Sequence, residues 1–311
     1  MARLIEMFRA AVEGRGLLGA SSRDDPFDES PLDSRTDAAH HALPINPGPT
    51  PSQYARAGTL FALTVLSTWV TGGPAYSIAI LSILLCHEMG HYLMCRRYRV
   101  PASLPLFIPM PLISPFGTMG AIIRMSGQIR NRRVLYDIGI AGPLAGILPA
   151  LAAVAWGLAH SEVILRPTGA APYMSLGDSL IFRGAQLLFF PGLGAHQDIL
   201  LHPVAFAGWA GLFVTALNLL PIGQLDGGHV LYGLLGSRSW KISIVVLGSL
   251  AALAVFYPGW WTLVVLLLLL GFRHPRTLDE TRPLDARRKA LGIFALVFFV
   301  VSFIPQPFRL P

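Results

Sequence analysis

Apolar residues along this chain gather into seven stretches that are separated by short polar or turn-forming segments. The stretches cover residues 58–70, 75–94, 134–159, 203–220, 242–257, 260–272 and 290–304. A helix that crosses a bilayer needs about 20 apolar residues, so several of these stretches are short for a full crossing. The pattern predicts an all-α polytopic membrane protein with about six to seven transmembrane segments, some of them short or tilted.

The composition supports a membrane protein. The 311 residues are 53% hydrophobic and only 13% charged, whereas about a quarter of the residues in a soluble domain are charged. The net charge of +7 would suggest nucleic acid as the partner of a soluble chain. Here the positive-inside rule accounts for it better. We therefore expect an integral multi-pass protein surrounded by a lipid bilayer, with no nucleic-acid partner.

The distribution of basic residues predicts the topology. If the N-terminus is cytoplasmic and 242–272 forms a hairpin at Pro258-Gly259, the cytoplasmic side receives 21 of the 24 lysines and arginines. This arrangement gives seven segments and places the C-terminus outside. Residues 1–56 hold eight of the seventeen acids among Pro, Ser and Gly, which predicts a polar, disordered cytoplasmic tail. We expect the membrane-embedded domain to cover 57–305 and a short C-terminal tail to cover 306–311.

Two connections are more than simple loops. Residues 101–131 contain five prolines, which exclude a regular helix. The glycines and β-branched residues of 116–125 predict a short β-hairpin or re-entrant loop on the cytoplasmic side. On the opposite side, within 161–202, the apolar run 179–190 is expected to pack at the membrane interface.

The strongest chemical signal is His87-Glu88-Met89-Gly90-His91, which lies inside an apolar stretch. Two histidines four residues apart lie on one face of a helix, so both imidazoles can reach one metal ion. Glu88 lies about 100° further round the helix, near enough to act on a water molecule at that metal. Charged and imidazole side chains are expensive in a bilayer and indicate a functional site.

A zinc peptidase needs three protein ligands and one open position for water. Among the acids outside the tail, only Glu88 and Asp226 fall in or against apolar stretches at matching depth. Asp226 is followed by Gly227 and Gly228, which we expect to break the helix and let the backbone approach the metal site. Asp226 is therefore the predicted third ligand. The ligand set alone would also accept iron or cobalt.

The segment 218–229 reads Asn-Leu-Leu-Pro-Ile-Gly-Gln-Leu-Asp-Gly-Gly-His. Together with the HEMGH motif it resembles the site-2 protease family of intramembrane zinc metalloproteases, whose motifs are HExxH and NxxPxxxLDG. The glycine-rich run 139–146 resembles the third core helix of that family. The resemblance covers residues 75–235, a three-helix catalytic core, and the chain lacks the PDZ insertion of some members.

The resemblance implies that His87, His91 and Asp226 bind one catalytic Zn²⁺, that Glu88 is the general base, and that Asn218 holds the substrate or the developing oxyanion. It implies an intramembrane zinc endopeptidase that cuts a single-span membrane protein, in regulated intramembrane proteolysis. We expect a prokaryotic cell (inner) membrane and an active site that opens to the cytoplasm. The sequence leaves the oligomeric state open.

Other interpretations remain for the same residues. The HEMGH side chains could form a polar face buried in a bundle, Asp226 could cap a helix, and Asn218 could make an interhelical hydrogen bond. His229 is expected to neighbour the ligand, and Asp137 to orient a core residue or to bind Arg132 or Arg133. The alternative functions are a zinc-binding transporter or receptor on the same scaffold, or housekeeping cleavage of signal-peptide remnants.

Overall fold

A computed structural model of the chain describes residues 48–125, 129–166, 175–194, 196–272, 274 and 276–309. Most of the prediction for the tail 1–56 therefore lies outside the described residues. The described helices are α2 (Pro51–Arg97), α3 (Arg132–Ala159), α4 (Leu180–Phe189), α5 (Pro203–Asn218), α6 (Asp226–Leu235), α7 (Ser239–Phe256), α8 (Trp260–Leu270) and α9 (Ala286–Ser302). The described strands are β1 (Leu106–Pro109), β2 (Thr118–Ile122), β3 (Glu162–Leu165), β4 (Ser175–Leu176), β5 (Gln197–Leu200) and β6 (Phe308–Arg309).

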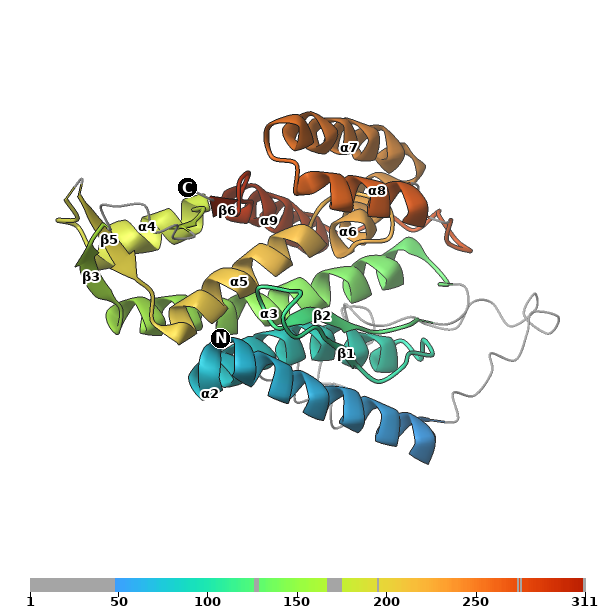
Figure 1. Ribbon diagram of the computed structural model, residues 1–311. Coiled ribbons are helices and arrows are strands. Elements are labelled where there is room, and N and C mark those ends of the chain that lie inside the picture. Colours follow the sequence, from blue (N-terminus) through green and yellow to red (C-terminus); the bar gives the residue numbers. More distant parts are fainter. Residues whose placement is uncertain are drawn as a thin grey trace, which may run out of the picture.

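Helix α2 is bent back on itself into two antiparallel arms (Figure 1). The reversal is at Gly73, whose φ of 79° and ψ of −179° are accessible to glycine and strained for other residues. Across the turn the hydroxyls of Thr68 and Ser77 lie 2.7 Å apart. The turn predicted between the stretches 58–70 and 75–94 is thus confirmed. The first arm begins earlier than predicted, at Pro51.

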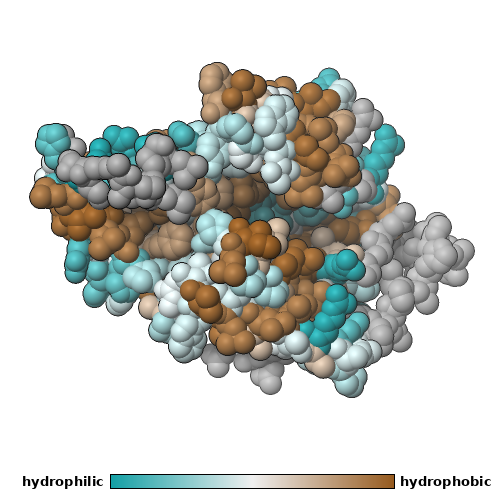
Figure 2. All heavy atoms as spheres, viewed as in Figure 1, coloured by the Kyte–Doolittle hydropathy of each residue, from teal (hydrophilic) through white to brown (hydrophobic). Residues whose placement is uncertain are grey.

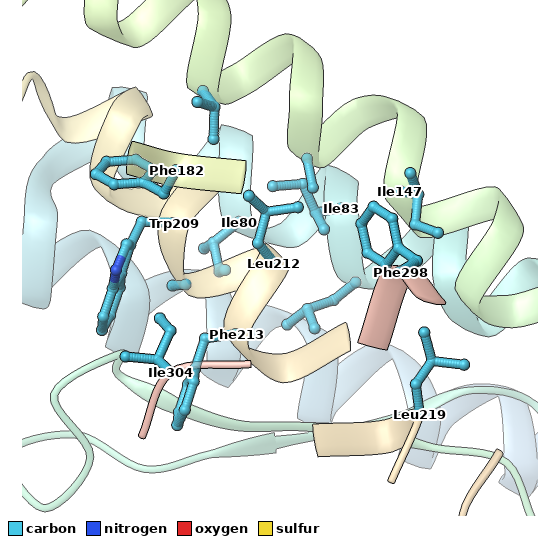
Figure 3. Packing of buried hydrophobic residues seen from close by; sticks show 14 of the residues in the cluster. Ile80, Ile83, Ile147, Phe182, Trp209, Leu212, Phe213, Leu219, Phe298 and Ile304 are labelled. Carbon is cyan, nitrogen blue, oxygen red and sulfur yellow. The ribbon is translucent and has the colours of Figure 1, made fainter. Parts of the chain in front are cut away.

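The core lies where α2, α3 and α5 pack together, with α9 completing it. Figure 3 shows side chains from these helices meeting there, among them Ile83 of α2, Ile147 of α3, Leu212 of α5 and Phe298 of α9. Small residues let α3 and α5 come close. A Cβ added at Gly157 would lie 2.2 Å from the backbone nitrogen of Ala205, so only glycine permits this approach.

The proline-rich connection forms the predicted β-hairpin. Strands β1 and β2 pair antiparallel and pack against α2. The loop between them runs back alongside α2 to the level of its turn. There the Ser67 hydroxyl donates to the carbonyl of Gly117, and the Tyr76 hydroxyl donates to the carbonyl of Phe116 at 3.0 Å. The Phe116 ring packs among aromatic side chains of α5. The connection therefore forms a hairpin whose loop lies along α2.

The connection between α3 and α5 gathers at one end of the molecule, at the left in Figure 1. Strands β3 and β5 pair antiparallel there, and β4 pairs with β6 near the C-terminus. The apolar run 179–190 forms α4, which buries Phe182 and leaves Leu187 and Leu188 exposed. The opposite ends of the helices carry the basic connections, so the structure is compatible with the predicted sidedness.

Three of the described helical segments are long and apolar enough to cross a membrane: α2, α3 and the run from Asp226 to Phe256 that joins α6 to α7. This is fewer than the six to seven predicted segments. Helices α5 and α9 have 16 and 17 residues and α8 has 11, short of the roughly 20 that a crossing needs. In addition, the first two predicted segments are the two arms of one bent helix.

The surface is strongly apolar over these helices. Val245 and Phe256 of α7 are 67% and 84% exposed, as expected for side chains that face lipid. Figure 2 shows broad hydrophobic patches on the face in view, and a hollow between the part that contains α2 and the part that contains α7. The described residues thus form a mostly helical membrane protein, in agreement with the sequence.

Candidate metal centre

Three polar side chains from two distant parts of the chain meet in the interior. His87 and His91 are one turn apart on the second arm of α2, and Asp226 is the first residue of α6. The Nε2 atoms of His87 and His91 lie 3.1 and 3.2 Å from Oδ2 of Asp226 and 3.2 Å from each other. The structure therefore brings together the three residues that the sequence predicted as ligands.

A hydrogen bond at Nδ1 of His91 shows that the other ring nitrogen, Nε2, is the one available to bind a metal ion. Nδ1 of His91 lies 2.7 Å from the carbonyl oxygen of Ile138, and because a carbonyl only accepts, Nδ1 carries the proton. In the neutral ring Nε2 then presents a lone pair. It faces a carboxylate oxygen of Asp226, which also presents lone pairs. Two acceptors at 3.2 Å repel each other unless a cation or a proton lies between them.

Glycines on α3 make room for both histidines. A Cβ at Gly142 would lie 2.0 Å from Nε2 of His91, and a Cβ at Gly146 would lie 3.1 Å from Cβ of His87. A Cβ at Gly90 of α2 would in turn lie 2.4 Å from the carbonyl oxygen of Ala141. The glycines therefore let α2 and α3 pack closely. The structure adds that the space serves the imidazole rings themselves.

Asp226 reaches the histidines because α6 begins at this residue. Leu225 before it is extended, and no side chain caps the helix. A Cβ at Gly227 would lie 2.0 Å from the carbonyl oxygen of Leu219, and one at Gly228 would lie 2.3 Å from that of Gly223. The two glycines were expected to break a helix beside the metal. They instead lie in the first turn of α6 and let it close tightly on the preceding loop.

Glu88 and Asn218 complete the polar set. Glu88 is 95% buried on the same arm of α2 as the two histidines, next to His87 in sequence. Asn218 is the last residue of α5, and its Nδ2 lies 3.3 Å from Nε2 of His87. A carboxylate and an amide donor therefore lie beside the three candidate ligands, and both come from helices that form the core.

His229, expected as a neighbour of the third ligand, has a partner that the sequence did not indicate. Its Nδ1 lies 2.7 Å from Nε2 of His274, in the connection between α8 and α9. The two residues are 45 positions apart, and His274 belongs to no motif. Only the path of the chain brings them together.

Asp137 also has a different partner from those considered. Its carboxylate is bound by both ends of the Arg288 guanidinium, with Nε 2.8 Å from Oδ1 and Nη2 2.7 Å from Oδ2. The expected partners Arg132 and Arg133 were chosen because they are close in sequence. The structure corrects this choice, because α9 packs beside the start of α3 and carries Arg288 to the carboxylate.

The three-residue cluster fits zinc. Two imidazoles and a carboxylate are a known catalytic zinc set, and tetrahedral ligands at 2.0–2.1 Å from zinc lie about 3.3 Å apart. The observed separations of 3.1–3.2 Å between the donor atoms are close to this value. The facing lone pairs of His91 and Asp226 point to the same occupant.

Comparison with known proteins agrees with this geometry. The model of the family described as Peptidase family M50 matches residues 75–257. The chain belongs to this family. The match includes every predicted ligand, Glu88 and Asn218, and it confirms the resemblance to the site-2 proteases. Membership in the family implies a catalytic zinc, which the His-His-Asp cluster fits.

Curated relatives extend the similarity. The chain is 31% identical over 254 residues to "Probable zinc metalloprotease EGY1, chloroplastic" of Arabidopsis thaliana, covering 78% of this chain and 45% of that protein. It is also 31% identical over 256 residues to the rice (Oryza sativa subsp. japonica) protein of the same name, covering 78% and 42%. The chain thus spans less than half the length of these relatives. Their names place them in chloroplasts, which does not agree with the expected prokaryotic membrane.

Proposed function

We propose that this protein is an intramembrane zinc endopeptidase that hydrolyses peptide bonds in or near the transmembrane segments of membrane-protein substrates. His87, His91 and Asp226 would hold the zinc ion. Glu88 is the general base, and Asn218 binds the substrate or the oxyanion. The observation that carries this proposal is the meeting of the three donor atoms beside a buried carboxylate, within helices apolar enough to lie in a membrane.

The bound zinc ion would polarise the peptide carbonyl and lower the pKa of the attacking water. The chain's own residues supply the remaining chemistry. Glu88 accepts a proton from the water as it attacks and returns that proton to the leaving amine. The Asn218 amide donates a hydrogen bond to the oxygen on which negative charge develops. The Ile138 carbonyl keeps His91 in the tautomer that directs Nε2 to the metal.

Cleavage of a transmembrane substrate requires new hydrogen-bond partners for the substrate backbone. A transmembrane helix has its amides paired internally, so a segment must unwind before cleavage, and its freed amides need new partners. Strand β2 is paired on one side only, with β1, among the described strands. We propose that its other edge binds the unwound segment by strand addition. The exposed Met119 and Ile122 side chains would lie beside that segment.

We further propose how the whole protein lies in the membrane. The short helices α5, α8 and α9 and both arms of α2 lie within the bilayer, giving six to seven segments. The protease domain covers the predicted 57–305 together with residues 51–56, which begin α2, and Phe308–Arg309, which form β6. The side with the basic connections is the cytoplasmic one. A single-span substrate is cut in regulated proteolysis, and a fragment is released to that side.

A cleavage assay tests the proposal directly. The purified protein in detergent is incubated with a single-span model substrate, and wild type is compared with Glu88→Gln. We expect the variant to bind one zinc ion per chain but to lose at least 100-fold in cleavage rate. A chelator should abolish cleavage by the wild type, and added zinc should restore it.

The alternative functions give different results in the same experiment. A zinc-binding transporter or receptor would bind zinc stoichiometrically and cleave no member of a broad substrate panel, and Glu88→Gln would change nothing measurable there. That result would overturn the peptidase. Housekeeping cleavage shares the active site, and it would be recognised by efficient cutting of signal-peptide remnants in preference to intact single-span proteins.

A further inference from the structure

The connection from α8 to α9 and the start of α9 contact both helices that pack beside the metal site. We propose that His274 and Arg288 are positioning residues for the metal centre. In this proposal Arg288 holds α3 against His91, and His274 fixes the orientation of α6, which carries Asp226. The inference rests on the proposed function for its catalytic consequence. Both residues lie beyond the part of the chain that the family model matches, which ends at residue 257.

The contact with α3 is a buried ion pair. Arg288 binds Asp137 through two parallel hydrogen bonds of 2.8 and 2.7 Å, and the two side chains are only 12% and 8% exposed. A bidentate pair of this kind fixes the direction of both groups. The next residue on α3 is Ile138, whose carbonyl accepts from His91. Arg288 therefore fixes the part of α3 whose next carbonyl, that of Ile138, orients His91.

The same carboxylate also reaches α2. The Tyr98 hydroxyl donates to Oδ2 of Asp137 at 2.5 Å. Tyr98 follows His91 by seven residues, which is two helical turns and hence nearly the same face. Asp137 thus joins the end of α2, the start of α3 and α9 at one point. A shift of α3 along α2 would break these bonds and would move the Ile138 carbonyl away from His91.

The contact with α6 involves the turn that follows Asp226. His229 is one turn after Asp226 and bonds His274 at 2.7 Å. One turn further on, the Tyr232 ring packs on the His274 ring with centroids 4.6 Å apart, and its hydroxyl donates to Glu280. Because α6 has no side-chain cap at its start, these contacts restrain its rotation. Rotation about the helix axis would swing Asp226 out of line with the histidines.

Backbone hydrogen bonds anchor the connection itself. The amide of Leu278 donates to Ile129 at 3.2 Å, and that of Asp279 donates to Arg130 at 2.8 Å. Arg133 adds a bond from its Nε to the carbonyl of Pro283, also at 2.8 Å. Residues 278–283 are therefore anchored alongside the start of α3.

The experiment uses the full-length protein in detergent and measures metal binding as well as activity. The variants are His274→Ala, His274→Gln and Arg288→Lys. Controls are Arg276→Ala and Arg287→Ala, which remove exposed cations from the same segment. For each variant we would determine zinc affinity by competition with a chelator, the visible spectrum of the cobalt-substituted protein, kcat and KM, and the thermal unfolding midpoint.

We expect His274→Ala to lower zinc affinity and kcat by about 10- to 100-fold, the usual effect of losing a group that orients a ligand. KM should stay within about twofold, and the cobalt spectrum should shift. Glutamine can donate and accept a hydrogen bond, so His274→Gln should recover most of the affinity. Arg288→Lys keeps the charge but loses the bidentate geometry, and should resemble His274→Ala. The controls should match wild type.

Two results would overturn the inference. One is wild-type zinc affinity and an unchanged cobalt spectrum in both His274→Ala and Arg288→Lys. The other is a loss that glutamine does not restore and that follows the unfolding midpoint, which would mark a purely structural role. If Arg288→Lys fails to fold, the His274 pair still decides the outcome. If the wild type binds zinc but cleaves nothing, the proposed peptidase fails while the metal-binding measurements still test the positioning.

Discussion

Gly142 of α3 lies directly against Nε2 of His91, the candidate metal-binding nitrogen, so that a Cβ at position 142 would be only 2.0 Å from it. The contact joins the glycine-rich run to the HEMGH motif. The missing methyl group at Gly142 leaves the space that the His91 ring, a candidate metal ligand, occupies. The residue's small size serves the site as well as the packing of helices.

Substitution of Gly142 should therefore disable the metal centre. In Gly142→Ala the methyl group must displace the His91 ring, and we expect zinc affinity and cleavage each to fall at least 100-fold, beyond the effect of losing a group that only orients a ligand. Zinc content after dialysis and cleavage rate would measure this. Gly248→Ala in α7 is the matched control, because its Cβ would meet nothing within 4 Å. It should be stabilising by about 0.5–1 kcal/mol.

Loss of the Asn218 amide should affect the chemical step. Asn218→Ala removes a donor whose nitrogen is 3.3 Å from His87 Nε2. Removing one oxyanion donor lowers kcat by about 100- to 1,000-fold in other hydrolases. Steady-state kinetics with zinc content measured in parallel would check this. An unchanged kcat with weakened zinc binding would indicate instead that Asn218 only supports the His87 ring.

The edge of β2 should be needed for cleavage and not for metal binding. Ile122→Pro removes a backbone donor from β2, so we expect cleavage of a transmembrane substrate to fall at least tenfold while one zinc ion stays bound. Ile122→Ala is the control, because it keeps the backbone amide and removes only side-chain atoms. Equal cleavage by both variants and the wild type would contradict strand addition.

The bend of α2 should depend on a single backbone conformation. The φ of Gly73 is 79°, and a Cβ there would meet nothing within 4 Å, so substitution tests the backbone alone. We expect Gly73→Ala to lower the free energy of unfolding by about 1–3 kcal/mol. Gly58→Ala in the first arm also meets nothing and has no such φ. Equilibrium unfolding in detergent should show that only the first variant is destabilised.

Much of the site could be predicted from the sequence because its chemistry is local. The spacing of His87 and His91 places both rings on one helix face whatever the rest of the chain does. Asp226 could be found by elimination, because few acids lie near apolar stretches and a metal needs a third ligand. The hairpin after α2 was also predictable, since prolines exclude a helix and the following residues favour strands.

The remaining features depend on contacts between residues far apart in the chain. The partner of Asp137 is Arg288, 151 positions away, whereas sequence proximity suggested Arg132 or Arg133. Three described segments are long and apolar enough to cross a membrane, where six to seven transmembrane segments were predicted. An apolar stretch does not show whether its residues form a full crossing, one arm of a bent helix or a short helix. The role of Gly227 and Gly228 was also misjudged, because their close neighbours lie in the loop before α6.

The sequence by itself predicted which groups would bind the metal and act on water, because residue type and helical spacing limit that chemistry to a few positions. It also determined that the chain belongs in a membrane, because apolar content and the placement of basic residues do not depend on the fold. Only the tertiary structure decided how the ligands are held. A carbonyl of α3 sets the tautomer of His91. The start of α6 sets the orientation of Asp226, and α9 brings Arg288 to Asp137. Such packing brings together residues that are far apart in the sequence, and nothing in the sequence indicates that they are in contact.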